Sequence, residues 1–188
     1  MEKRIMKYEK TVILKNGESC IIRNGAESDA EAVLENFILT HGQTDFLTTY
    51  PEETSFTVEY EREYLKKRAD SKREAALVAE VGGKIAGTAG VDGLGRAEKA
   101  RHRASFGISI DKAFWGLGIG RALTEACAEC AKAAGYLQLE LEVVASNERA
   151  VSLYRSVGFT EYGRNPRAFR PRTGGWQETI LMRLELDK

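Results

Sequence analysis

The order strand, glycine-rich loop, helix in the middle of the chain constrains the fold more than any other feature. Apolar residues alternate over residues 104–111, which predicts a strand. Glycines follow at alternate positions, Gly116, Gly118 and Gly120, and lead into an amphipathic helix that we expect to end near Ala134. Glycine lets backbone N–H groups crowd around a ligand, and a helix N-terminus adds unpaired donors. The loop therefore predicts a phosphate-binding site, with a plain turn before a helix as the simpler alternative.

Other glycine motifs do not fit this loop. A G-x-G-x-x-G motif would need glycine where the chain has Arg121 or Leu123, and the Gly-Lys-Ser/Thr of a P-loop is absent. The loop thus predicts a phosphate or pyrophosphate ligand without indicating a dinucleotide fold or an NTPase.

Composition narrows the class of protein. The 188 residues carry 28 basic and 28 acidic side chains, so the formal net charge is zero, and we expect neither nucleic acid nor an anionic membrane as a partner. No apolar run approaches the roughly 20 residues that span a bilayer, and the first ten residues lack the apolar core of a signal peptide. The 3 cysteines form no disulfide framework. These features favour a cytoplasmic location.

The whole chain, 1–188, is expected to form a single domain of mixed α/β class. Residues 1–24 predict an N-terminal hairpin that turns at Asn16 and Gly17, and residues 75–186 predict the functional core. The expected core strands are 75–81, 84–91, 104–111, 137–144, 159–169 and 177–186. The expected helices are 28–39, 56–69, the one after the glycine loop, and 148–157, with a loop over 41–53. Together they predict a central, mostly antiparallel mixed sheet of about seven strands with helices on both faces.

A second informative stretch covers residues 143–159, VVASNERAVSLYRSVGF. It has the pattern of a strand end, a capped helix and a glycine stop. Asn147, Ala150, Val151 and Tyr154 stand at i, i+3, i+4 and i+7, on one helix face. The ends of this row lie about 10 Å apart at 1.5 Å per residue. The row suits a long, thin ligand with polar groups at both ends.

Together the two stretches resemble the GNAT superfamily of acyl-CoA-dependent N-acetyltransferases. The pyrophosphate motif of that family, [Q/R]-x-x-G-x-[G/A], is matched at both small positions by Gly118 and Gly120, with Trp115 in place of the usual Gln or Arg. The family's second pattern, N-x-x-A-x-x-[L/F]-Y-x-x-x-G-F, is met in full from Asn147 to Phe159. The resemblance covers about residues 75–186 and implies a GNAT-like fold with acetyl-CoA as cosubstrate and no metal.

The resemblance implies a role for each matched position. Tyr154 would protonate the leaving thiolate as general acid, and the backbone N–H of Ile108 would polarise the thioester carbonyl. Asn147 would bond the pantetheine amide, although it is equally suited to cap the helix. The cofactor-binding residues implied are Ile108, Ser109, Ile110, Trp115, Gly116, Leu117, Gly118, Ile119, Gly120, Arg121, Asn147 and Tyr154.

The acceptor is less well specified by the sequence. The resemblance implies direct attack by a primary amine of a small cation, a peptide or a protein, and we expect Asp45, Phe46 and Glu142 to contact it. The alternatives are an acyl-CoA sensor without catalysis on the same fold, or a different nucleotide-binding enzyme. A homodimer through sheet edges is also compatible with the family.

Several further residues are of types that can have chemical roles. Cys127 and Cys130 lie on the apolar face of a predicted helix, so we expect core residues and not zinc ligands. His41 falls in the presumed acceptor loop, and His102 in a solvated connection. The candidates for a general base, none of them preferred, are Asp45, Glu52, Glu53, Glu140 and Glu142. The arginines expected on a solvated hairpin are Arg164, Arg167, Arg170 and Arg172.

Overall fold

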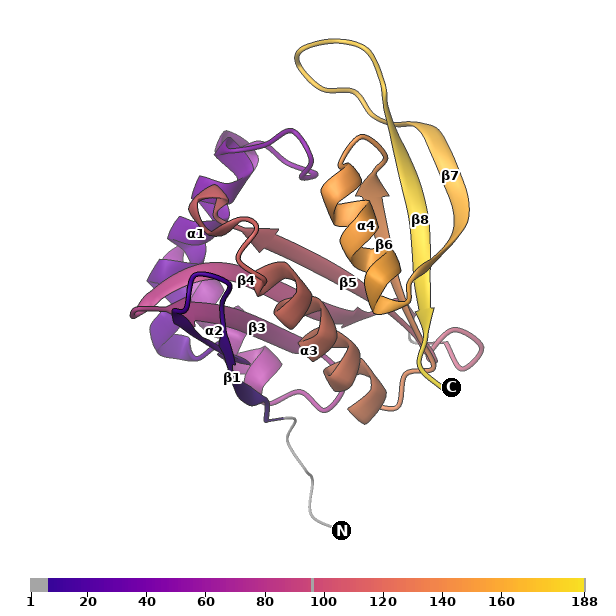
Figure 1. The fold of residues 1–188 in the computed structure, drawn as a ribbon. Helices are drawn as coiled ribbons and strands as arrows, with labels where there is room; N and C mark the ends of the chain where they lie inside the picture. The colour runs from indigo at the N-terminus through magenta and orange to yellow at the C-terminus, as the bar shows by residue number, and fades with distance from the viewer. Residues whose placement is uncertain (1–6, 96, 188) are drawn as a thin grey trace.

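The computed structural model describes residues 7–95 and 97–187, so residues 1–6 of the predicted N-terminal segment lie outside it. The order of elements is the expected one (Figure 1). The strands are β1 Glu9–Ile13, β2 Ser19–Asn24, β3 Ala75–Val81, β4 Lys84–Gly93, β5 Arg103–Ile110, β6 Gln138–Val144, β7 Thr160–Phe169 and β8 Gln177–Glu185. The α-helices are α1 Ala30–Gly42, α2 Val58–Ala69, α3 Ile119–Ala133 and α4 Glu148–Val157. Short 3-10 turns cover Glu27–Asp29, Pro51–Glu53 and Lys112–Phe114.

The strands form one mixed sheet in the order β1-β2-β3-β4-β5-β6-β8-β7. Only β5 and β6 are parallel, which confirms the predicted mostly antiparallel class. The sheet has 8 strands where about seven were expected. The N-terminal hairpin belongs to this sheet, because β2 pairs with β3 from Cys20–Val81 to Asn24–Leu77.

Helices cover both faces of the sheet, each with its own apolar cluster. On one face α3 buries a stripe at helical spacing, which includes Leu123, Cys127 and Cys130. The prediction that both cysteines are core residues is confirmed, since each is at most 2% exposed. On the other face α1 and α2 pack through a smaller cluster around Val33 and Leu65. None of the helices in the described ranges is long and apolar enough to cross a bilayer.

The parallel pairing of β5 with β6 is short. It covers Arg103–Gln138, Ala104–Leu139 and Ser105–Glu140 only. Beyond these pairs β5 continues to Ile110 and β6 to Val144, and the two strands separate (Figure 1). The edge of β5 that faces β6 therefore has backbone N–H and C=O groups without a neighbouring strand, and these groups need another partner.

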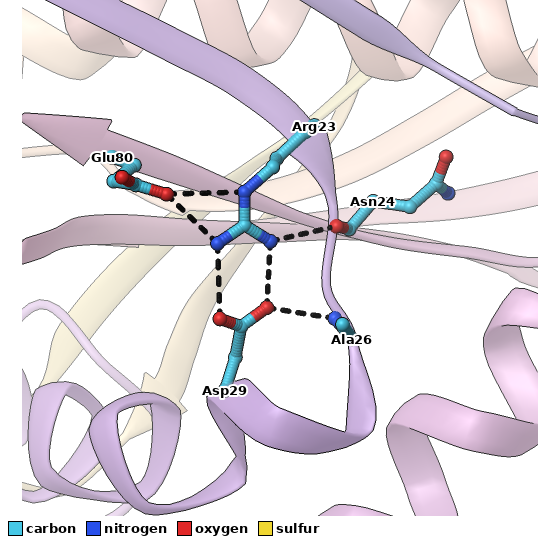
Figure 2. A network of polar contacts seen from close by, with 5 residues as sticks. All are labelled: Arg23, Asn24, Ala26, Asp29 and Glu80. Carbon is cyan, nitrogen blue, oxygen red and sulfur yellow. Dashed lines mark hydrogen bonds and ion pairs between the residues drawn. The ribbon is translucent and has the colours of Figure 1, made fainter. Parts of the chain in front are cut away.

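An arginine links the sheet to the start of α1. Figure 2 shows the guanidinium of Arg23, from β2, between the carboxylates of Asp29 and Glu80. It donates to both Asp29 oxygens at 2.6 and 2.9 Å, and to Glu80 Oε2 at 2.8 and 3.1 Å. The same Asp29 accepts from the N–H of Ala26 at 2.7 Å. One bidentate contact thus fixes the chain where it leaves the sheet for the helix layer.

The first long helix extends further than the sequence pattern predicted. We expected it to end near Leu39 and a loop to begin at His41, but α1 continues to Gly42. Contacts within its last turn explain the difference. The ring of His41 stacks on Phe37 at 3.8 Å between centroids, and its Nδ1–H donates to the Phe37 carbonyl at 2.7 Å. These contacts bury His41 in the helix layer, where a residue of the acceptor loop was expected.

Candidate active site

A large cavity lies where β5 and β6 separate. Its volume is about 1240 Å³, above the 300–1,000 Å³ that is typical of ligand sites. Phe106 and Tyr154 line it from the α3–α4 face, and Glu61 and Gly107 from the α1–α2 face. Because residues of both faces line one cavity, it passes through the gap in the sheet. We call it the central cavity.

The glycine loop forms one end of the central cavity. Gly116 has a φ of +82° and Gly118, the N-cap of α3, a φ of +109°, which is the left-handed region that favours glycine. A Cβ added at either residue would meet no atom within 4 Å, so open space borders both. Among the described residues no side chain caps α3. The first amides of α3 are therefore available to an anion.

The third glycine of the motif has a different role. Gly120 has no left-handed φ, and an added Cβ would approach Leu153 Cδ2 at 3.1 Å and Ile110 Cδ1 at 3.4 Å. Its lack of a side chain lets α4 and the end of β5 approach α3 closely. Two glycines of the motif thus leave open space beside the loop, and the third lets α3 pack closely against α4 and β5.

Trp115 anchors the loop to β5. Its indole N–H donates to the carbonyl of Ile110 at 2.8 Å, and the guanidinium of Arg149 lies 4.0 Å from its ring centroid. Arg149 lines the central cavity and was not among the predicted site residues. No sequence signal connects it to Trp115, because only the fold brings the start of α4 over the loop.

Tyr154 lines the central cavity from α4. Its ring packs edge-on against Phe106 at 6.0 Å and beside Phe159 at 5.9 Å. Burial raises the pKa of its phenol, so the hydroxyl stays protonated at neutral pH. No described residue bonds this hydroxyl. It is therefore a proton donor without a partner in the described part of the chain.

Asn147 both caps α4 and lines the central cavity. Its Oδ1 accepts from the N–H of Ala150 at 3.4 Å, a capping contact, while its Nδ2 has no partner among the described residues. Both roles weighed for this residue are thus compatible with its position.

The remaining predicted cofactor residues divide into two groups. Ile108, Ser109, Ile110 and Arg121 line the central cavity, and Arg121 also contacts Glu125 and Ser156 at 3.2 and 2.6 Å. The side chains of Leu117 and Ile119 do not line it. The Leu117 carbonyl accepts from the Lys15 N–H at 3.0 Å, and Ile119 is fully buried.

Comparison with known proteins identifies the fold and the family. The model of the acetyltransferase (GNAT) family matches residues 43–159. This chain is a member of the GNAT family. A GNAT acetyltransferase structure from Streptococcus pneumoniae is 28% identical with a TM-score of 0.84, over 89% of this chain and 99% of that one. A ribosomal-protein-alanine N-acetyltransferase structure from Brucella melitensis is 27% identical with a TM-score of 0.77, over 88% and 99%.

Curated relatives of this GNAT chain match over a shorter stretch. The ribosomal protein bS18-alanine N-acetyltransferase of Escherichia coli is 38% identical over 81 residues, which is 43% of this chain and 54% of that protein. The chain thus spans about half the length of that relative, and about a quarter, 26%, of a matched Mycobacterium leprae protein.

The acceptor residues predicted for this GNAT chain are only partly brought together. Phe46 and Glu142 line the central cavity. Asp45 is not among the lining residues; its backbone carbonyl accepts from Gln177 Nε2 at 3.0 Å. His41 lines the cavity from α1, and burial lowers the pKa of its imidazole, which is therefore neutral at pH 7.

Two carboxylates on β6 border the cavity and differ in burial and in hydrogen-bond partners. Glu140 is buried and accepts from Arg103 at 2.5 and 2.7 Å and from the Tyr162 hydroxyl at 3.1 Å. The hydrogen bonds from Arg103 hold the pKa of Glu140 below its usual value. Glu142 is exposed and accepts from the buried Thr179 hydroxyl at 2.5 Å. Glu142 is thus the β6 carboxylate that retains oxygens open to the cavity.

The four arginines of the β7–β8 hairpin are exposed, as expected for a solvated face, and two of them pair with acidic residues. Arg164 pairs with Glu161 and Glu178, each at 2.5 Å. Arg172 pairs with Glu52 and stacks on Tyr50 at 3.9 Å. The contacts of Arg172 fasten the hairpin to the loop between α1 and α2. Within the described ranges, no group of three His, Cys, Asp or Glu is placed to hold a metal.

Proposed function

We propose that this chain transfers an acetyl group from acetyl-CoA to a primary amine that attacks directly within a ternary complex. The observation that carries the proposal is the central cavity, which joins an uncapped helix N-terminus to a buried phenol and continues through the gap in the sheet. The open space beside Gly116 and Gly118 fits a pyrophosphate, and the unpaired edge of β5 fits the amide groups of pantetheine. The bound cosubstrate would supply an activated acetyl thioester.

Each role proposed for the chain follows from its contacts. The amides at the start of α3 hold phosphate oxygens, and Asn147 offers its free Nδ2 to the pantetheine arm. A backbone N–H of β5, proposed as that of Ile108, polarises the thioester carbonyl. Tyr154 gives its proton to the departing thiolate. We propose that Glu142 accepts the amine proton through water, because Glu140 is saturated by its partners.

The acceptor is proposed as a small or peptide amine. Some relatives are named for acetylating an alanine of a ribosomal protein, so a peptide N-terminus belongs in any acceptor panel. The buried, free thiols of Cys20, Cys127 and Cys130 suit a reducing compartment, and we place the reaction in the cytoplasm on that ground.

Tyr154→Phe tests the proposal. We expect kcat for thiol release from acetyl-CoA to fall by about 100-fold or more, because general acid catalysis contributes about 10²–10⁴-fold. The dissociation constant of acetyl-CoA, measured by calorimetry, should stay unchanged. Tyr136→Phe is the matched control, since Tyr136 is 3% exposed but does not line the cavity. It should keep full activity.

Two outcomes would contradict the proposed acetyl transfer. Tight binding of acetyl-CoA without turnover for any amine in the panel would favour an acyl-CoA sensor. Stronger thermal stabilisation by ATP or NAD than by CoA would favour a different nucleotide-binding protein, since ligands of the native state raise its apparent stability.

A further inference from the structure

A buried carboxylate without a partner lies on the α1–α2 side of the central cavity. Glu61 stands on the inner face of α2, one turn before the fully buried Leu65, and is 8% exposed. Its side chain lines the cavity. Within residues 7–95 and 97–187, no side chain or backbone group donates a hydrogen bond to its carboxylate, and no cation pairs with it. Glu61 is therefore an acceptor that the described protein leaves unsatisfied.

The other acidic residues that line the central cavity have partners. Glu140 is held by Arg103 and Tyr162, as described above. Asp92 pairs with Arg68 at 2.5 Å, and Glu142 accepts from Thr179. Among the described acidic residues of the cavity wall, Glu61 alone has no such contact.

Aromatic rings line the same cavity as Glu61. Phe37 and Phe56 lie 5.6 Å apart between centroids, and Phe56 stacks on Tyr60 at 4.9 Å. All three line the central cavity, as does Tyr64 from the next turn of α2. Aromatic faces pack against apolar groups and also attract cations. The walls around Glu61 thus suit a ligand with an apolar body and a positive charge.

The sheet beneath these rings leaves room for such a ligand. The α1–α2 face of β4 and β5 carries small residues, among them Gly90 and Gly107. A Cβ added at Gly107 would meet no atom within 4 Å. One added at Gly90 would come to 3.5 Å from the Ala75 carbonyl oxygen and to 3.9 Å from the Tyr64 hydroxyl, which are ordinary van der Waals distances. The space over Gly107 lies beside the unpaired part of β5, where the acetyl group is proposed to sit.

A carboxylate buried without a partner is costly, because it loses water and gains no compensating bond. Burial raises the pKa of Glu61, and no opposing interaction lowers it. Such a cost is common at sites where a ligand supplies the missing partner. An ammonium group would supply both the charge and the donors.

We propose that Glu61 binds the ammonium group of the acceptor, and that the acceptor is a singly charged primary amine on an apolar body. This inference rests on the proposed function and names the acceptor class for the same cavity. One unpaired carboxylate matches one ammonium, which disfavours polyamines. An amino acid with a free carboxylate would be repelled by Glu61 and by Glu142.

The test is calorimetric binding of 2-phenylethylamine to the full chain saturated with CoA, a complex that cannot transfer an acetyl group. Its neutral isostere 2-phenylethanol, the zwitterion phenylalanine and the polycation spermidine complete the panel. We expect wild type to bind the amine at least about 10-fold more tightly than each of the others, because a hydrogen bond to a charged group is worth about 10- to 100-fold in affinity. In Glu61→Gln this preference over 2-phenylethanol should disappear.

Glu59→Gln is the matched control, because Glu59 is exposed on the same helix. It should leave all four affinities unchanged. Glu61→Gln should also raise the melting temperature of the ligand-free protein, since it removes a buried charge. A merely structural carboxylate would instead lower the melting temperature when replaced. Loss of amine affinity together with higher stability is the signature of a binding residue.

Three results would overturn the inference. Glu61→Gln could bind 2-phenylethylamine as wild type does, wild type could fail to bind it, or phenylalanine or spermidine could bind more tightly than the amine. Failure of the proposed function would look different, because it would appear as absence of turnover with every amine while these binding constants stay measurable.

Discussion

Replacing Gly118 with alanine should separate the phosphate-binding role of the loop from its structural role. Gly118 has a φ of +109°, and a left-handed backbone costs an L-residue about 1–2 kcal/mol. In a chain of 188 residues that cost lowers Tm by roughly 2–8 °C. The added Cβ also projects into the open space beside the first amides of α3. Loss of one hydrogen bond to a charged phosphate should weaken acetyl-CoA binding by about 10- to 100-fold.

Two other glycines, one in the first turn of α3 and one just after its end, serve as controls for Gly118→Ala. Gly135, just beyond the other end of α3, has a φ of +81° and equally open surroundings, so Gly135→Ala should lose similar stability and keep its acetyl-CoA affinity. Gly120 has no left-handed φ, and the atoms nearest to an added Cβ are the side-chain ends of Leu153 and Ile110. Gly120→Ala should therefore stay within about 1 kcal/mol of wild type in stability.

Calorimetric titration with acetyl-CoA and thermal unfolding of each variant give the two quantities. The reasoning would be refuted if Gly118→Ala bound acetyl-CoA as tightly as Gly135→Ala does. It would also fail if Gly135→Ala lost affinity to the same extent, because the loss would then follow stability and not the position of the loop.

Two further predictions concern the contacts of Arg23 at the start of α1 and the contact of Arg149 with Trp115 in the glycine loop. Arg23→Leu leaves Asp29 and Glu80 without their common partner and should cost about 2–3 kcal/mol at neutral pH, measured by urea unfolding. The hydrogen bonds from Arg23 lower the pKa of Asp29 below its ordinary 3.8. The difference in unfolding free energy between wild type and Arg23→Leu should therefore shrink as pH falls below about 4. A difference that stays constant with pH would contradict this assignment. Arg149→Ala removes the cation over Trp115 and should weaken acetyl-CoA binding several-fold. The fluorescence of Trp115, measured in a Trp176→Phe background, should then respond differently to acetyl-CoA.

Much of the fold could be predicted from local patterns. The glycine loop, the capped helix α4 and the alternating strands each carry their signal within a few consecutive residues, and the order of elements was expected correctly. The extent of α1 was missed because its last turn depends on stacking of His41 on Phe37, which an amphipathic pattern does not contain. The pairing of β2 with β3 is likewise a long-range contact.

The candidate site could be predicted where backbone and family motifs define it, and not where separate elements meet. Gly116, Gly118 and Tyr154 belong to motifs and line the central cavity. Glu61 lies on a helix so rich in charge that its sequence looks solvated on every face. Only the packing of α2 over the sheet buries this carboxylate. Asp45 is not among the residues that line the cavity, and its backbone carbonyl accepts from Gln177, a contact that the sequence pattern does not contain.

The separation of β5 from β6 has a consequence for how the molecule is held together. Five strands on one side and three on the other are joined by just three parallel residue pairs, so the sheet consists of two halves with a narrow junction. A pantetheine arm lying along β5 would fill the gap and act as a ninth, removable strand. The nucleotide-bearing ligand would then be a structural member of the sheet during each turnover, and its departure would reopen the gap between the two halves.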